Sequence, residues 1–65
     1  MTPKMPIVLN GYYLVGELIY HIIHIYDASY YCRTYDLKGN FKKEDAWSKN
    51  YIHTFAIKRV KPKSN

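Results

Sequence analysis

Tyr31, Arg33 and Tyr35 alternate along one short segment, and their types and spacing are suited to binding. Successive side chains of a β-strand point to opposite faces, so these three would share one face. Aromatic rings stack on nucleic-acid bases at about 1–3 kcal/mol per base, and Arg adds phosphate or cation–π contacts. Tyr and Arg also dominate hot spots of protein interfaces. An alternative stays open, in which Tyr31 and Tyr35 only cover a small core.

Basic residues elsewhere in the chain extend this hypothesis. Residues 1–45 carry five basic and five acidic side chains, so the whole net charge of +5 comes from the residues after Asp45. Such an asymmetry favours a polyanionic partner, although solubility and a basic tail would explain it equally well. The basic residues that we expect to contribute to binding are Lys38, Lys42 and Lys43 beside the aromatic strand, and Lys58, Arg59 and Lys61 near the C-terminus.

Residues that could carry catalysis are few. His21 and His24 would share a face of a helix, but an odd separation sends them to opposite faces of a strand, where they cannot chelate one metal. Cys32 has no His placed beside it by the sequence, and free Cys is among the most often buried residue types. Glu44 and Asp45 follow two lysines and should stay ionised. We therefore expect no enzyme, no catalytic residue, no metal site and no cofactor.

Length and cysteine content limit the architecture. A chain of 65 residues has room for one domain, in which residues 1–5 and 61–65 are expected to be loose ends. The single cysteine excludes an internal disulfide and suits an intracellular, cytoplasmic setting. The longest nearly apolar run, residues 18–26, is about half the length that a transmembrane helix needs, so we expect a soluble protein with no membrane partner.

Turn signals fall at short intervals, as in small all-β domains. Asn10-Gly11 between two apolar runs predicts a β-hairpin with a type I′ turn. Residues 27–29 form a second turn candidate. Residues 36–40 form a third, in which Gly39 supplies the left-handed residue.

The segments between these turns are expected to be strands. Residues 18–26 are expected to continue the preceding strand, so that the two form one long strand bent at Gly16. An amphipathic helix over residues 18–26 is the alternative. Residues 30–36 and 54–60 are predicted strands. Residues 41–52 fit a short strand or a helix, with Asn40 as a helix cap and Trp47 meeting Tyr51 at a spacing of four residues.

These elements predict a mostly β fold, a small five-stranded SH3-like barrel with one short helical turn before the last strand. The alternative is an α+β fold of β-hairpin, helix and strand, with residues 40–51 as the helix. Some small phage inhibitors of bacterial RNA polymerase have that layout. Their ending, an aromatic strand followed by a basic-Val-basic-Pro element, resembles residues 55–62 here.

Two functions are consistent with these features. The first is a small, basic, non-enzymatic interaction protein, a phage-type modulator or inhibitor that binds a host protein at an acidic or nucleic-acid-binding surface. The second is a module that binds single-stranded nucleic acid through the Tyr, Arg and Lys face. A homo-oligomer stays open as a further arrangement.

Overall fold

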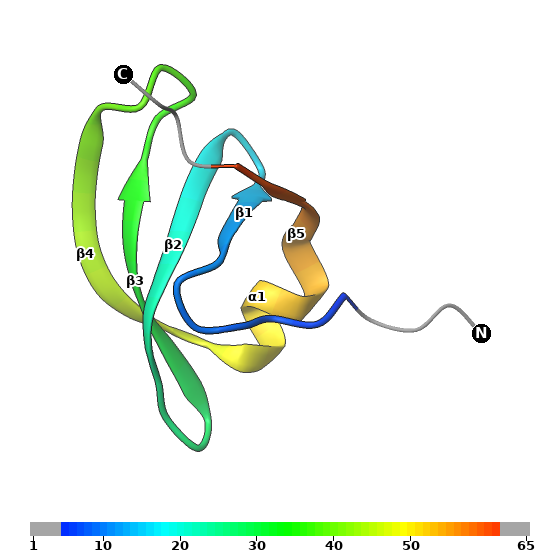
Figure 1. The fold of residues 1–65 in the computed structure, drawn as a ribbon. Coiled ribbons are helices and arrows are strands. Elements are labelled where there is room, and N and C mark those ends of the chain that lie inside the picture. Colours follow the sequence, from blue (N-terminus) through cyan, green and yellow to red (C-terminus); the bar gives the residue numbers. More distant parts are fainter. Residues whose placement is uncertain (1–4, 62–65) are drawn as a thin grey trace.

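The chain folds into five antiparallel strands in one sheet, with a short helix before the last strand (Figure 1). The structure, a computed structural model, describes residues 5–61. The elements are β1 (Tyr12–Val15), β2 (Leu18–Ile25), β3 (Ser29–Tyr35), β4 (Phe41–Ser48), α1 (Lys49–Phe55) and β5 (Ala56–Val60).

Strand order across the sheet is β4-β3-β2-β1-β5, so β5 returns to pair with the first strand. The predicted mostly β class is confirmed, and the alternative with a helix over residues 40–51 is wrong, because residues 41–48 form β4. The pairing leaves β4 and β5 as the sheet edges, so by itself it does not establish the SH3-like barrel.

On the β4 edge, the Asp45 carboxylate accepts a hydrogen bond of 2.8 Å from the Ala46 N–H.

The core lies between the sheet and α1. Alternate residues of β1, β2 and β3 point toward the helix, as expected for strands with one buried face. α1 contributes Ile52, which is fully buried, and burying a side chain of this size stabilises the fold by roughly 1.5–3 kcal/mol. The buried hydrophobic residues are Tyr13, Val15, Tyr20, Ile22, Tyr30, Cys32 and Ile52.

Gly16 forms a turn rather than a bend within one strand. The strand predicted for residues 18–26 is confirmed as β2, but Val15 pairs with Leu18, so Gly16 and Glu17 are a two-residue hairpin loop. Gly16 has φ of +64° and Glu17 does not have positive φ, which is the pattern of a type II′ turn. Glycine is therefore required here by the backbone conformation.

The hairpin predicted at Asn10-Gly11 is wrong. The residues before it form no strand, and the Gly11 N–H donates to the Val8 carbonyl (3.1 Å) in a turn centred one residue earlier. Asn10 alone has positive φ, +66°. A Cβ on Gly11 would lie 2.6 Å from the Tyr13 hydroxyl oxygen, so glycine is needed here for close packing against that ring.

The two other predicted turns are confirmed. The Tyr26 N–H donates to the Ser29 carbonyl (2.8 Å) between β2 and β3. Between β3 and β4, Gly39 has φ of +93° and Asp36 Oδ1 accepts from the N–H groups of Lys38 and Asn40, both at 2.9 Å. The bond from the Asn40 N–H is the main reason that the pKa of Asp36 is lowered.

Residues 41–52 contain both predicted alternatives in succession, a strand and then a helix. Ser48 caps α1, its Oγ accepting from the Tyr51 N–H at 3.0 Å. The capping role predicted for Asn40 is wrong, because its amide groups bond to Asp36 in the hairpin. The predicted contact of Trp47 with Tyr51 is confirmed, with ring centroids 5.1 Å apart, although Trp47 belongs to β4.

Within residues 5–61, α1 is too short to cross a bilayer and no other helix is present. The predicted loose ends, residues 1–5 and 61–65, fall outside the described residues except for Met5 and Lys61.

Candidate functional site

Tyr31, Arg33 and Tyr35 lie together on the sheet face that points away from α1, which we call the outer face. All three side chains are half-buried, whereas the residues between them are buried on the α1 side. The predicted alternation along β3 is therefore confirmed.

Neighbouring strands add residues that the sequence did not place on this face. Phe41 of β4 pairs with Tyr35, and Glu44 pairs with Arg33. On the other side of β3, His21 of β2 pairs with Arg33, and Tyr12 of β1 pairs with His21. Directly opposed residues of antiparallel strands point to the same face. The outer-face residues considered below are Tyr12, His21, Tyr31, Arg33, Tyr35, Phe41 and Glu44.

Glu44 holds two of the predicted binding residues in place. The Tyr31 hydroxyl donates to Glu44 Oε2 at 2.9 Å, and Arg33 Nε lies 3.8 Å from Glu44 Oε1. The hydrogen bond to this carboxylate is the main reason that the pKa of Tyr31 is raised. Arg33 is thus paired with an acid, yet its side chain stays 43% exposed.

Aromatic contacts order the same region. The Arg33 guanidinium carbon lies 4.8 Å from the centroid of the Phe41 ring, within the range of a cation–π interaction. Phe41 also meets Tyr35 edge to face, with centroids 5.8 Å apart. These contacts hold the outward-facing side chains against one another.

Tyr12 and His21 continue this arrangement across β2 and β1. Their rings are parallel within 3°, and the centroids are 4.2 Å apart. Burial, and secondarily the neighbouring Arg33 charge, lower the pKa of His21. The neutral imidazole is therefore favoured in this stack.

The prediction that His21 and His24 point to opposite faces is wrong. A β-bulge between Ile22 and His24 shifts the register, so His24 pairs with Tyr31 while His21 pairs with Arg33. One extra residue reverses the alternation, which places both imidazoles on the outer face. Within residues 5–61, no group of three His, Cys, Asp or Glu side chains is placed to hold a metal.

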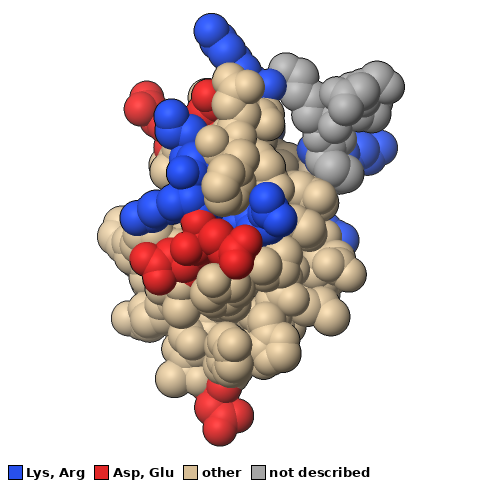
Figure 2. Space-filling model, turned by 90° about the vertical axis from the view of Figure 1, so that its left-hand side faces the viewer, with Lys and Arg blue, Asp and Glu red and all other residues tan. Residues whose placement is uncertain are grey.

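The basic residues of the β3–β4 hairpin are divided between two faces. Lys43 pairs with the buried Thr34, and its Nζ lies 4.8 Å from the centre of a Trp47 ring, so it does not extend the outer face. Lys42 lies at the β4 register shift, and Lys38 lies in the turn. Figure 2, which views the β4 side, shows acidic and basic groups in contact rather than a uniformly positive surface.

The basic residues at the end of the described chain lie on a different strand region from Arg33. Two strands, β2 and β1, separate β5 from β3, so Lys58, Arg59 and Lys61 form a distinct cationic region at the other sheet edge. Lys58 pairs with Leu14 and faces outward, whereas Arg59 pairs with the buried Tyr13. The sequence alone did not reveal this separation.

Cys32 occupies the core, as predicted. It is fully buried, and burial raises its pKa to about 12. Its Sγ donates to the Tyr30 carbonyl at 3.6 Å. A thiol in this environment is a poor nucleophile at neutral pH.

Sequence reasoning missed Tyr12, Phe41 and Glu44 as members of the outer face. Each becomes a neighbour only through strand register, and the β4 register depends on a bulge between Thr34 and Tyr35. The aromatic or acidic type of these residues was visible in the sequence, but the position opposite β3 was not.

Comparison with known proteins gave no match: no family model, no curated protein and no solved structure is significantly similar to this chain.

Proposed function

We propose that this chain is a small non-enzymatic interaction protein of the phage-modulator type, and that it binds a host protein through the outer face. The interface centres on Tyr31, Arg33, Tyr35 and Phe41. The burial and raised pKa of Cys32 support a non-enzymatic role. The small size and the Lys-, Tyr- and Ile-rich composition are the basis for the phage-type part of the proposal.

The position of Glu44 carries the choice of a protein partner. This carboxylate binds both Tyr31 and Arg33, so the centre of the face contains paired charges of both signs. A nucleic-acid strand would place phosphates near this acid and compete with it for Arg33. Protein hot spots instead combine Tyr and Arg with local charge pairing, and they tolerate an acid.

Preorganisation supports the same choice. Arg33 is held by Phe41 and Glu44, and Phe41 is held by Tyr35. Phe41 is nevertheless 49% exposed, so a partner can bury further apolar surface there. Side chains that are fixed before binding lose less conformational entropy on association.

Affinity capture from bacterial lysate, with and without nuclease, tests the proposal. The wild-type chain should retain a stoichiometric protein band that survives nuclease. Arg33→Ala and Phe41→Ala should each lose that band while keeping the native circular-dichroism spectrum. Hot-spot truncations of this kind weaken binding by about 2 kcal/mol or more, roughly thirtyfold.

Leu37→Ala is the matched control, because Leu37 is an exposed apolar residue of the β3–β4 turn outside the outer face as defined. It should leave capture unchanged. Capture that disappears with nuclease, together with steep salt dependence of binding to a single-stranded oligonucleotide, would assign the face to nucleic acid instead. Equal loss in Leu37→Ala and Arg33→Ala would refute the assignment of the site.

A further inference from the structure

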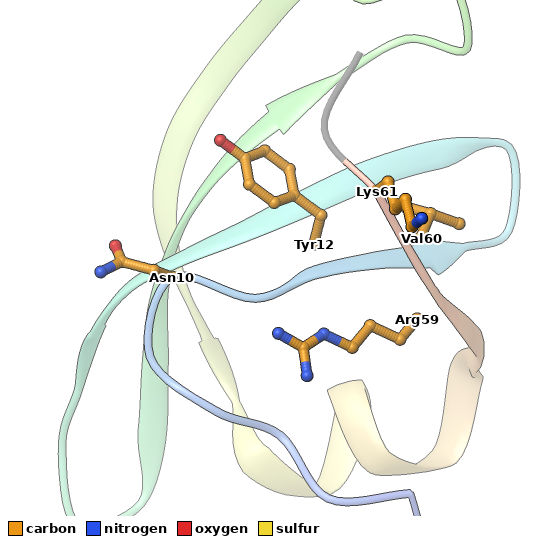
Figure 3. Close-up of a pocket in the computed structure, with 5 residues that line it drawn as sticks. All are labelled: Asn10, Tyr12, Arg59, Val60 and Lys61. Atoms are coloured by element: carbon orange, nitrogen blue, oxygen red, sulfur yellow. The ribbon is translucent and has the colours of Figure 1, made fainter. Parts of the chain in front are cut away.

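A pocket lies at the other end of the sheet, where the start of β1 meets the end of β5 (Figure 3). It has a volume of about 440 Å³, which is within the range of small-ligand sites. Its lining residues are Asn10, Tyr12, Arg59, Val60 and Lys61.

Backbone bonds hold the β1 wall of this pocket. Asn10, at φ of +66°, donates its N–H to the Ile22 carbonyl at 2.7 Å, and the Ile22 N–H donates to the Gly11 carbonyl at 3.0 Å. The entry to β1 is therefore tied to β2. Within residues 5–61 the Asn10 side-chain amide forms no hydrogen bond, so it remains able to bind a ligand.

The β1–β5 register brings different side chains to the pocket from the two faces of the sheet. Val60 pairs with Tyr12, and Arg59 pairs with Tyr13, so Arg59 and Val60 point to opposite faces. In Figure 3 the Arg59 side chain extends toward the Asn10 end of β1. Although these two residues start from opposite faces, both line the pocket, so a cation and an apolar side chain border the same space.

The pocket is positively charged. Arg59 and Lys61 line it together, and no acid does. Within residues 5–61 neither Arg59 nor Lys61 forms an ion pair with a carboxylate, so neither pocket cation is neutralised there. An anion is the ligand that this charge favours.

Tyr12 supplies a fixed aromatic residue. It is stacked on His21 at 4.2 Å, and burial lowers the pKa of that imidazole, so the stack is neutral near pH 7. Together with Val60, Tyr12 adds apolar surface beside the two cations. This combination suits an anion that also carries a planar ring better than it suits a bare ion.

We propose that this pocket binds a nucleoside monophosphate group, as a free nucleotide or as one residue of a single strand. Arg59 and Lys61 bind the phosphate, Tyr12 and Val60 contact the base, and the Asn10 amide bonds to a base edge or to the sugar. The site shares Tyr12 with the outer face but lies at the β1–β5 edge, apart from the Tyr31, Arg33, Tyr35 and Phe41 centre of the proposed interface, and it does not depend on the function proposed for that face.

Titration of the ¹⁵N-labelled full chain with adenosine monophosphate, followed by NMR, tests the proposal. Saturable shifts should appear at the amides of Asn10, Tyr12, Val60 and Lys61 at millimolar nucleotide. Adenosine and inorganic phosphate should each bind more weakly than the nucleotide, because each lacks one half of the contacts.

Variants on β5 provide the matched comparison. Arg59→Gln should weaken nucleotide binding about tenfold or more, the effect of losing one charge-assisted hydrogen bond. Lys58→Gln removes the same charge from the preceding residue, which does not line the pocket, and it should change the affinity less than about twofold, since exposed charges are largely screened. Both variants should keep the dispersed spectrum of the folded chain.

Absence of saturable shifts in the wild type would overturn the proposal. So would equal affinity for phosphate and nucleotide, or equal loss in Lys58→Gln and Arg59→Gln, because either result would show only diffuse charge. Phenyl phosphate that matches the nucleotide would also overturn it in favour of a phosphorylated aromatic side chain. If a short oligoadenylate binds more tightly than adenosine monophosphate and depends on Arg59 in the same way, the natural ligand is one residue of a single strand. If the two bind with equal affinity, the natural ligand is the free nucleotide.

Discussion

The Thr34 hydroxyl bridges to the backbone of Lys43 in both directions: it donates to the carbonyl oxygen at 3.0 Å and accepts from the N–H at 3.2 Å. Thr34 is fully buried. The bridge lies next to the bulge at which the β3–β4 register shifts. A side chain therefore joins the two strands where regular pairing is interrupted.

Thr34→Val should lower the free energy of unfolding by about 1–3 kcal/mol, because a similar shape remains while two backbone groups of Lys43 lose their partner. Thermal or urea unfolding measures the loss. Thr34→Ser keeps the hydroxyl and serves as the control, since hydrogen exchange at the Lys43 amide should stay slow in the Ser variant and become fast in the Val variant. Unchanged exchange in the Val variant would contradict the bridge.

Replacing the first two glycines by alanine should destabilise the fold for different reasons. Gly16→Ala should lower the free energy of unfolding by about 1–2 kcal/mol because alanine is strained at positive φ. A steric clash does not contribute, since a Cβ at Gly16 would meet no atom within 4 Å. Gly11→Ala should also displace the Tyr13 ring and weaken the bond from the Val8 N–H to the Tyr13 hydroxyl (2.9 Å). NMR shifts around Tyr13 should change in the Gly11 variant alone.

Ile52→Ala should destabilise the protein by roughly 2–5 kcal/mol, because Ile52 is the buried side chain through which α1 joins the core. Phe55→Ala, at the end of the same helix, removes a side chain that is 54% exposed and should cost much less. Urea unfolding of the two variants provides the comparison. Similar losses would show that Phe55 also belongs to the packed core.

His21 should titrate below its ordinary pKa of about 6.5. Because folding lowers this pKa, the folded chain binds the proton more weakly than the unfolded chain does. The contribution of His21 to stability is therefore complete above about pH 6.5 and is lost as the pH falls through the folded pKa.

NMR titration of the imidazole protons gives the pKa directly. Arg33→Gln should raise the pKa of His21 only partly, since burial is the larger cause and remains in the variant. Titration of wild-type His21 at or above the ordinary value would show that the ring is not desolvated by the stack with Tyr12.

Cys32 should resist thiol reagents in the folded protein at neutral pH, because burial both blocks access and raises its pKa to about 12. Reaction with an aromatic disulfide reagent should proceed at the rate of unfolding, and rapidly in urea. A fast stoichiometric reaction in native buffer would mean that β3 opens locally or that Cys32 is exposed.

The parts of this fold that sequence could predict are those set by local rules. The alternation along β3 followed from period two, and the Asp36 turn followed from an Asp-x-x-Gly pattern whose bonds are made within five residues. The end of β4 could not be predicted, because residues 41–52 have a mixed pattern and only Ser48 marks the change from strand to helix.

The pairing register between strands could not be predicted from the sequence. The bulge after Ile22 has no compositional signal, yet it places His24 on the outer face. The pairing of Glu44 with Arg33 likewise depends on a second bulge in the β3–β4 ladder. The function of Gly11 was misread because the Tyr13 ring that needs the space is known only from coordinates.

The short bond between Asp45 and Ala46 has a consequence for how copies of this protein behave when crowded. β4 is eight residues long and forms a sheet edge, which is the usual template for fibrillar growth. The Asp45 carboxylate accepts the hydrogen bond of the Ala46 N–H, so this N–H is not available to pair with the backbone of an incoming strand. The bond thus removes one of the donors that this rim offers to further chains, without the addition of another structural element.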